Sequence, residues 1–135
     1  MPADNRVFIA TRADDVDLLD FRDTVILRLR FPEQGNFVML GKVVITNIDD
    51  SADQNATVRL TTLDGETELD RAEIRIGKGN DSDNGAQSVS LQATLSLPAD
   101  TANEIVDLRC STSKGHARFA SLFAVQVGDL KKAGV

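Results

Sequence analysis

Residues 117–128 read ARFASLFAVQVG, and their apolar side chains fall on both faces of an extended strand. One face holds Ala117, Phe119, Ser121, Phe123, Val125 and Val127, and the other holds Ala120, Leu122 and Ala124. A strand with one solvated face alternates apolar and polar residues, whereas a strand that is apolar on both faces is covered on both. The stretch therefore predicts a strand in the middle of a sheet, with something packed against each side.

Residues 37–47, FVMLGKVVITN, have the same two-faced pattern. One side holds Phe37, Met39, Val43 and Ile45, and the other holds Val38, Leu40 and Val44. Gly41 interrupts the pattern, and a glycine within a strand marks a bulge or a close approach of another segment. We expect this stretch to be a second strand that is covered on both faces.

Residues 7–11 are a short apolar piece and a candidate first strand. Five further stretches alternate apolar and polar residues, with turn residues between them: 24–31, 56–63, 69–76, 88–97 and 105–112. Short strands at regular spacing favour a sandwich or a barrel. The aspartate-rich residues 12–23 fit a short helix or an irregular crossover, and we favour the crossover. We predict an all-β fold, an eight-stranded antiparallel jelly-roll β-sandwich, as one domain over residues 1–135 with loose termini at 1–5 and 129–135.

Composition limits the classes of partner. The chain has 135 residues, a formal net charge of −6 and 41% hydrophobic residues, which is typical of a globular domain. Nucleic acids and anionic membrane surfaces both attract Lys and Arg, so the acidic balance argues against both. No apolar run approaches the ~18 residues of a membrane helix, and the first 15 residues do not resemble a signal peptide. We expect a soluble protein, cytoplasmic or exported without a signal peptide.

The two stretches that are apolar on both faces would be neighbours in a jelly roll. In an eight-stranded jelly roll the first, eighth, third and sixth strands share one sheet, with the eighth beside the third. The pattern resembles the C1q/TNF-like jelly-roll family over most of the chain. FVMLGKVVITN is similar to the third strand of that family, which starts with an aromatic residue, and FASLFAVQVG is similar to its closing strand. The resemblance implies a homotrimer in which the inner sheet packs around a threefold axis.

We therefore predict an interface between subunits on these two strands. Its members are Val38, Leu40, Val44, Ala120, Leu122 and Ala124. An apolar patch of a few hundred Å2 that is left open is unusual for a monomer. The alternative is that residues 12–23 cover the patch within one subunit.

Few residues of the chain can carry chemistry. His116 and Cys110 are its single histidine and cysteine, which excludes an N/S zinc site built from one chain. We place His116 in an exposed hairpin turn over residues 113–116 and Cys110 in the core, so the two do not form a nucleophile–base pair. With no Trp or Tyr, a sugar-stacking cleft is not expected. We predict no enzymatic activity.

Two acidic loops offer oxygen ligands for calcium. Asp49 and Asp53 lie in one loop, and Asp81 and Asp83 lie in another, where residues 77–81 match the G-x-G-x-D pattern of calcium-binding repeats. The plain alternative is a solvated turn, and we expect no cofactor other than calcium. The predicted function is a structural or interaction module that self-associates and presents loops for binding or surface decoration. The alternative is a calcium- or ligand-binding sandwich that uses these loops.

Overall fold

The computed structural model describes residues 6–31, 34–62, 66–78, 85–98, 104–131 and 133–134. These residues form strands and no helix. The strands are β1 (Val7–Arg12), β2 (Val16–Leu19), β3 (Thr24–Phe31), β4 (Gly35–Asn47), β5 (Gln54–Thr62), β6 (Glu68–Ile76), β7 (Ala86–Leu97), β8 (Glu104–Thr112) and β9 (Lys114–Val127). No helix that could span a membrane occurs in the described part of the chain.

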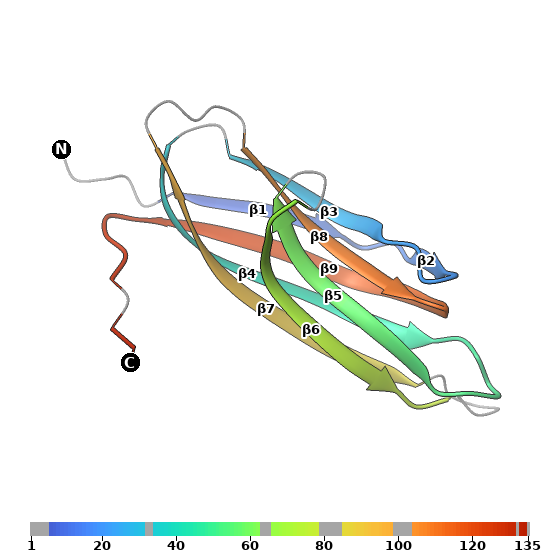
Figure 1. Ribbon diagram of the computed structural model, residues 1–135. Helices are drawn as coiled ribbons and strands as arrows, with labels where there is room; N and C mark the ends of the chain where they lie inside the picture. Colours follow the sequence, from blue (N-terminus) through green and yellow to red (C-terminus); the bar gives the residue numbers. More distant parts are fainter. Residues whose placement is uncertain are drawn as a thin grey trace.

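The strands form two antiparallel sheets that pack face to face (Figure 1). The β9 sheet has the order β1–β9–β4–β7, and β2 also pairs with β9. The β8 sheet has the order β3–β8–β5–β6. After β3 the chain crosses repeatedly between the sheets, as a jelly roll requires. The predicted fold is therefore confirmed, and so is the pairing of the two strands with apolar residues on both faces, β4 and β9.

The segment of residues 12–23 contains a ninth strand, which the sequence did not reveal. β2 pairs with β9 from Val16 opposite Ala117 to Leu19 opposite Lys114, and the side chain of Leu18 enters the core. A turn with positive φ at Asp20 and Phe21 then ends the strand. The prediction of an irregular crossover was wrong here because four residues are too few for alternation to stand out among aspartates.

The connection between β8 and β9 is a corner and not the predicted hairpin, because the two strands lie in different sheets. β9 already begins at Lys114. Gly115 pairs closely with β4, and a Cβ at this position would lie 2.7 Å from the carbonyl oxygen of Thr46. His116 is consequently a half-buried strand residue and not an exposed turn residue.

The core fills the space between the sheets and consists mainly of aliphatic side chains. At one end the rings of Phe8, Phe31 and Phe37 pack together, with centroids 4.7–6.1 Å apart. At the centre Gly41 leaves room for the side chains of the facing sheet, since a Cβ there would lie 3.3 Å from Cδ2 of Leu60. The glycine in this strand thus marks a close approach, one of the two predicted roles.

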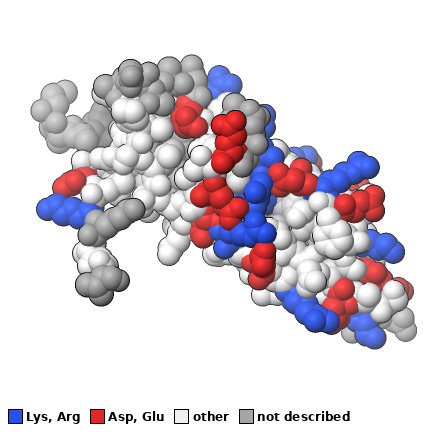
Figure 2. Space-filling model, in the orientation of Figure 1, with Lys and Arg blue, Asp and Glu red and all other residues white. Residues whose placement is uncertain are grey.

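The outer face of the β8 sheet is covered by charged side chains that pair with one another. The carboxylate of Asp107 is 0% exposed and accepts hydrogen bonds from Arg28 Nε at 2.8 Å and Arg109 Nη2 at 2.9 Å. Arg109 also donates to Asp23 at 2.8 Å and to Thr61 Oγ1 at 3.1 Å. Figure 2 shows basic and acidic side chains interspersed on the face that Figure 1 presents, with β5 and β6 in front. Long arginine side chains thereby shield this sheet from water.

Candidate functional site

A β-bulge in β9 decides which of its side chains face outward. Lys42 pairs with Ser121 and Val44 with Arg118, so two residues of β9, Phe119 and Ala120, stand opposite one residue of β4. Phe119 has a φ of 51° and is exposed. A bulge adds one residue to a strand and thereby changes the phase of its alternation. Odd-numbered residues such as Ala117 therefore face the core before the bulge, and even-numbered residues such as Ala120 face it after the bulge.

This bulge overturns half of the predicted interface. Ala120, Leu122 and Ala124 all lie buried in the core, so they cannot contact a neighbouring subunit. The outward residues of this half of β9 are Phe119, Ser121, Phe123 and Val125. The error arose because both faces of the stretch are apolar, and simple alternation does not reveal an inserted residue. The β4 members of the predicted set, Val38, Leu40 and Val44, do point outward.

Side chains from three neighbouring strands combine on the outside of the β9 sheet. Ile9, Phe123 and Leu40 form one row across β1, β9 and β4, and Val7, Val125 and Val38 form the next row. We call these six residues together with Phe119 and Val44 the apolar face. Sequence reasoning missed Val7 and Ile9, because residues 7–10 are all apolar and do not show which side chains face outward. The pairing of β1 with β9 places them on this surface.

The apolar face concentrates the exposed hydrophobic surface of the described residues. Five of the eight large hydrophobic side chains that are exposed belong to it: Val7, Ile9, Leu40, Phe119 and Phe123. Ile9 and Leu40 are 56% and 53% exposed. The next row along the sheet consists of Thr11, Ser121, Lys42 and Ser90, so a single charge borders the two apolar rows there. The two outer faces of the sandwich therefore differ in kind, one charged and one apolar.

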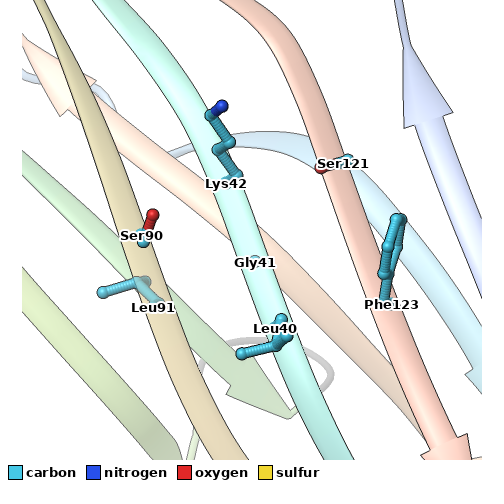
Figure 3. Close-up of a pocket in the computed structure, with 7 residues that line it drawn as sticks. All are labelled: Leu40, Gly41, Lys42, Ser90, Leu91, Ser121 and Phe123. Atoms are coloured by element: carbon cyan, nitrogen blue, oxygen red, sulfur yellow. The ribbon is translucent and has the colours of Figure 1, made fainter.

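A hollow of about 290 Å3 lies at the centre of this surface. Figure 3 shows Leu40 and Lys42 on either side of Gly41, with Phe123 on one neighbouring strand and Ser90 and Leu91 on the other. Apolar side chains and the backbone at Gly41 form its walls, while Lys42, Ser90 and Ser121 place polar groups at its edge. A hollow of this kind accepts an apolar group of modest size.

A small polar cluster borders the apolar face at its β2 end. Arg118 Nε donates to Asp15 Oδ1 at 3.0 Å, and the guanidinium lies 5.3 Å from the centroid of the Phe119 ring. His116 Nε2 lies 3.1 Å from Asp17 Oδ1 on the neighbouring strand. The cluster therefore lies beside Phe119, and its members place no nucleophile at His116.

Cys110 lies in the core, as predicted, facing inward from β8. Burial raises the pKa of its thiol to about 12, with a smaller contribution from the negative charge of Asp23. A thiol in this state is not a nucleophile at neutral pH. His116 lies in the other sheet, so the only histidine and the only cysteine of the chain do not form a catalytic pair.

The carboxylates of the acidic loop between β4 and β5 accept hydrogen bonds within the loop and from the end of β6 and the residues after it. Asp49 accepts hydrogen bonds from the backbone and hydroxyl of Ser51, which lower its pKa below the ordinary 3.8. Asp53 accepts one from the backbone of Lys78 and one from Arg75, and its pKa is lowered as well. Asp81 and Asp83 lie outside the described residues, within which no group of three or more His, Cys, Asp or Glu side chains could hold a metal ion. The calcium role stays a prediction.

Comparisons with known proteins identify the fold. No protein family and no curated protein sequence matches the chain. Among solved structures, VP2 of the infectious bursal disease virus subviral particle is similar, with a TM-score of 0.55 and 17% identity over 94% of this chain. That alignment covers 34% of VP2, so this chain spans about a third of its length. A structure of T=1 particles derived from infectious bursal virus gives a TM-score of 0.53 and 16% identity, over 94% of this chain and 33% of that one.

The Eiger TNF of S. frugiperda matches along its whole length, with a TM-score of 0.51 and 12% identity over 97% of this chain and 98% of that one. At such identities a likeness shows the fold alone. The chain is an antiparallel jelly-roll sandwich, and its apolar face lies on the sheet formed by β1, β9, β4 and β7.

Proposed function

We propose that this chain is a non-catalytic structural module that self-associates through the apolar face, as a homotrimer. The observation that carries the proposal is the gathering of five of the eight exposed large hydrophobic side chains on one sheet surface. Exposed apolar patches of this kind mark interaction sites, because leaving them in water is unfavourable. A partner with an apolar surface of its own removes the most apolar area from water on binding, and a second copy of the chain has such a surface.

The energetics of burial agree with a contact between several subunits. Fully burying one large aliphatic or aromatic side chain stabilises by about 1.5–3 kcal/mol, so covering five half-exposed ones gives roughly 4–8 kcal/mol per subunit. Association costs about 4–15 kcal/mol in rigid-body freedom. The five side chains alone roughly offset that cost. A stable assembly therefore also uses the half-buried Val38, Val44 and Val125, as happens when each subunit contacts two neighbours.

The number three comes from the resemblance to the C1q/TNF-like family. In that family the inner sheet, built from the first, eighth, third and sixth strands, packs around a threefold axis. The corresponding sheet here is β1–β9–β4–β7, which carries the apolar face. The full-length similarity to a TNF of S. frugiperda supports this part of the proposal. The charged β8 sheet then faces outward, and the loops at the ends of the sandwich remain open for binding or surface decoration.

The mass in solution tests the proposal. Light scattering after size exclusion should give three times the 14.6 kDa of one chain. Leu40→Asp places a charge at the centre of the apolar face, where its desolvation opposes association, and should give a folded monomer. Ile48→Asp is the matched control, because Ile48 is an exposed aliphatic residue in the loop after β4 and should leave the trimer intact. A wild-type monomer at high concentration, or an unchanged mass for Leu40→Asp, would contradict the proposal.

A further inference from the structure

Phe119 is an extra residue in its strand. Ala117 faces the core, Arg118 faces outward and Ala120 faces the core again, so β9 would alternate correctly if Phe119 were absent. Its backbone has a φ of 51°, which a bulky side chain rarely adopts, and its ring is 61% exposed. The residue thus adds backbone strain to the subunit without filling its core. Phe21 has a similar φ but lies in a turn, whereas Phe119 lies inside a strand, on the apolar face. Backbone strain tends to gather at functional sites, and the place of this strain directs attention to the apolar face.

The ring of Phe119 lies against the side chain of Arg118. The guanidinium of Arg118 lies 5.3 Å from the ring centroid, a cation–π distance. Asp15 holds that guanidinium in turn, at 3.0 Å from Nε. The bulge directs the side chain outward, and the paired Arg118 lies beside its ring. A protruding ring that is ordered in advance loses little conformational freedom on binding.

The hollow beside Leu40 and Phe123 is large enough to hold a phenyl ring. It measures about 290 Å3, and a cavity of about 150 Å3 already accommodates benzene. Phe119 does not line the hollow of its own subunit, although it belongs to the same face. One apolar face therefore carries both a projecting ring and a hollow that its own ring does not fill.

We propose that Phe119 of one copy of this chain inserts into the hollow of the neighbouring copy. The inference rests on the proposed self-association and names its central contact. A closed ring of subunits needs two different, complementary surfaces on each subunit, and the projecting ring and the hollow are such a pair. A standard interface buries roughly 800 Å2 per partner, so a contact that enters the hollow is favoured over one that touches the exposed side chains alone. Insertion adds the walls of the hollow to the contact.

Photo-crosslinking tests the contact directly. Phe119 is replaced by p-benzoyl-phenylalanine, the protein is irradiated, and covalent dimers are isolated on a denaturing gel and digested with trypsin. The cross-link is expected to join the peptide of residues 119–131 in one copy to that of residues 31–42 in another, which holds Leu40, or to the β7 part of the peptide of residues 79–109, which holds Ser90 and Leu91. Fragment-ion spectra assign the cross-linked residue within the longer peptide. Dimers whose cross-links lead only to β5, β6 or β8 would refute the contact.

Two substitutions approach the same contact from opposite sides. Phe119→Ala removes the projecting ring, and Ser90→Phe fills the hollow from within its own subunit. Each should weaken association by about 30-fold or more, as expected for a residue at the centre of an interface. Phe21→Ala is the matched control, since Phe21 is also a phenylalanine with a φ of 56° and is 60% exposed, but lies in the turn after β2. It should leave association unchanged, and circular dichroism verifies the fold of each variant.

The outcomes separate this inference from the proposed function. A trimer that gives the expected cross-link and is weakened by Phe119→Ala supports both. A trimer that is unaffected by Phe119→Ala and Ser90→Phe, and gives no cross-link to the hollow, refutes the inserted ring but leaves self-association in place. A wild-type monomer at high concentration refutes both.

Discussion

The buried carboxylate of Asp107 makes a sharp prediction about stability. Asp107→Ala removes the anion that accepts hydrogen bonds from Arg28 and Arg109 and leaves Arg109, which is 11% exposed, without one of its two carboxylate partners. Removing one member of a buried ion pair costs about 3–5 kcal/mol, because the remaining charge is desolvated. Arg28 is half exposed and can be rehydrated, and Arg109 keeps Asp23 and Thr61. We therefore expect a loss of about 3 kcal/mol.

A loss of this size is easily measured. The midpoint of urea denaturation should fall by about 1–2 M at an unchanged slope, and the melting temperature by roughly 10 °C. All variants are compared at one protomer concentration, because self-association adds concentration-dependent stability.

Asp23→Ala is the matched control for this prediction. Asp23 also pairs with Arg109, but its side chain is 46% exposed, so its removal should cost less than about 1 kcal/mol. If Asp107→Ala costs no more than Asp23→Ala, burial does not increase the contribution of this network to stability. The ion pairs on the outer face of the β8 sheet then contribute no more than solvent-exposed ones.

Two further predictions concern single titratable groups. Because burial raises the pKa of the Cys110 thiol to about 12, a disulfide reagent at pH 8 should label the native protein at least 100-fold more slowly than the urea-unfolded chain; rapid labelling of the native state would show that the core around β8 opens readily. The lowered pKa of Asp53 stabilises the fold above the ordinary value of 3.8, and this contribution is lost as the pH falls through the lower folded value. Asp53→Asn should therefore destabilise the protein at pH 7 and make little difference near pH 2, as followed by thermal melts, and an equal effect at both pH values would contradict the assignment.

The pairing of β4 with β9 was predictable because sequence alternation reports burial on each face separately. Residues 37–47 and 117–128 are apolar on both faces, and a jelly roll brings the two together. Alternation does not show where a bulge reverses which residues of a strand face the core. The bulges between Val25 and Leu27 and between Lys42 and Val44 are both places where the register shifts. The second of them moved Ala120, Leu122 and Ala124 from the predicted interface to the core.

The burial of the charged side chains on the β8 sheet could not be predicted from sequence periodicity, for another reason. Asp107 and Arg109 do occupy outward positions, as their alternation with Val106 and Leu108 predicts. Their burial depends on side chains from β3 and from the turn before it, Arg28 and Asp23, which are about 80 residues away in sequence. A polar pattern identifies the outer face of a sheet, but only the cross-strand register shows whether long side chains then cover it.

These two outer faces suggest why the sandwich carries its strain at Phe119. On the β8 sheet, arginine and aspartate side chains from adjacent strands pair and cover the backbone within one subunit. On the apolar face, the rows of Ile9, Phe123 and Leu40 and of Val7, Val125 and Val38 contain no such pair. Deleting Phe119 would restore regular alternation in β9 and keep Ala120, Leu122 and Ala124 in the core. On the proposed contact, this deletion should leave the fold of the subunit in place and remove the side chain that reaches the neighbouring copy.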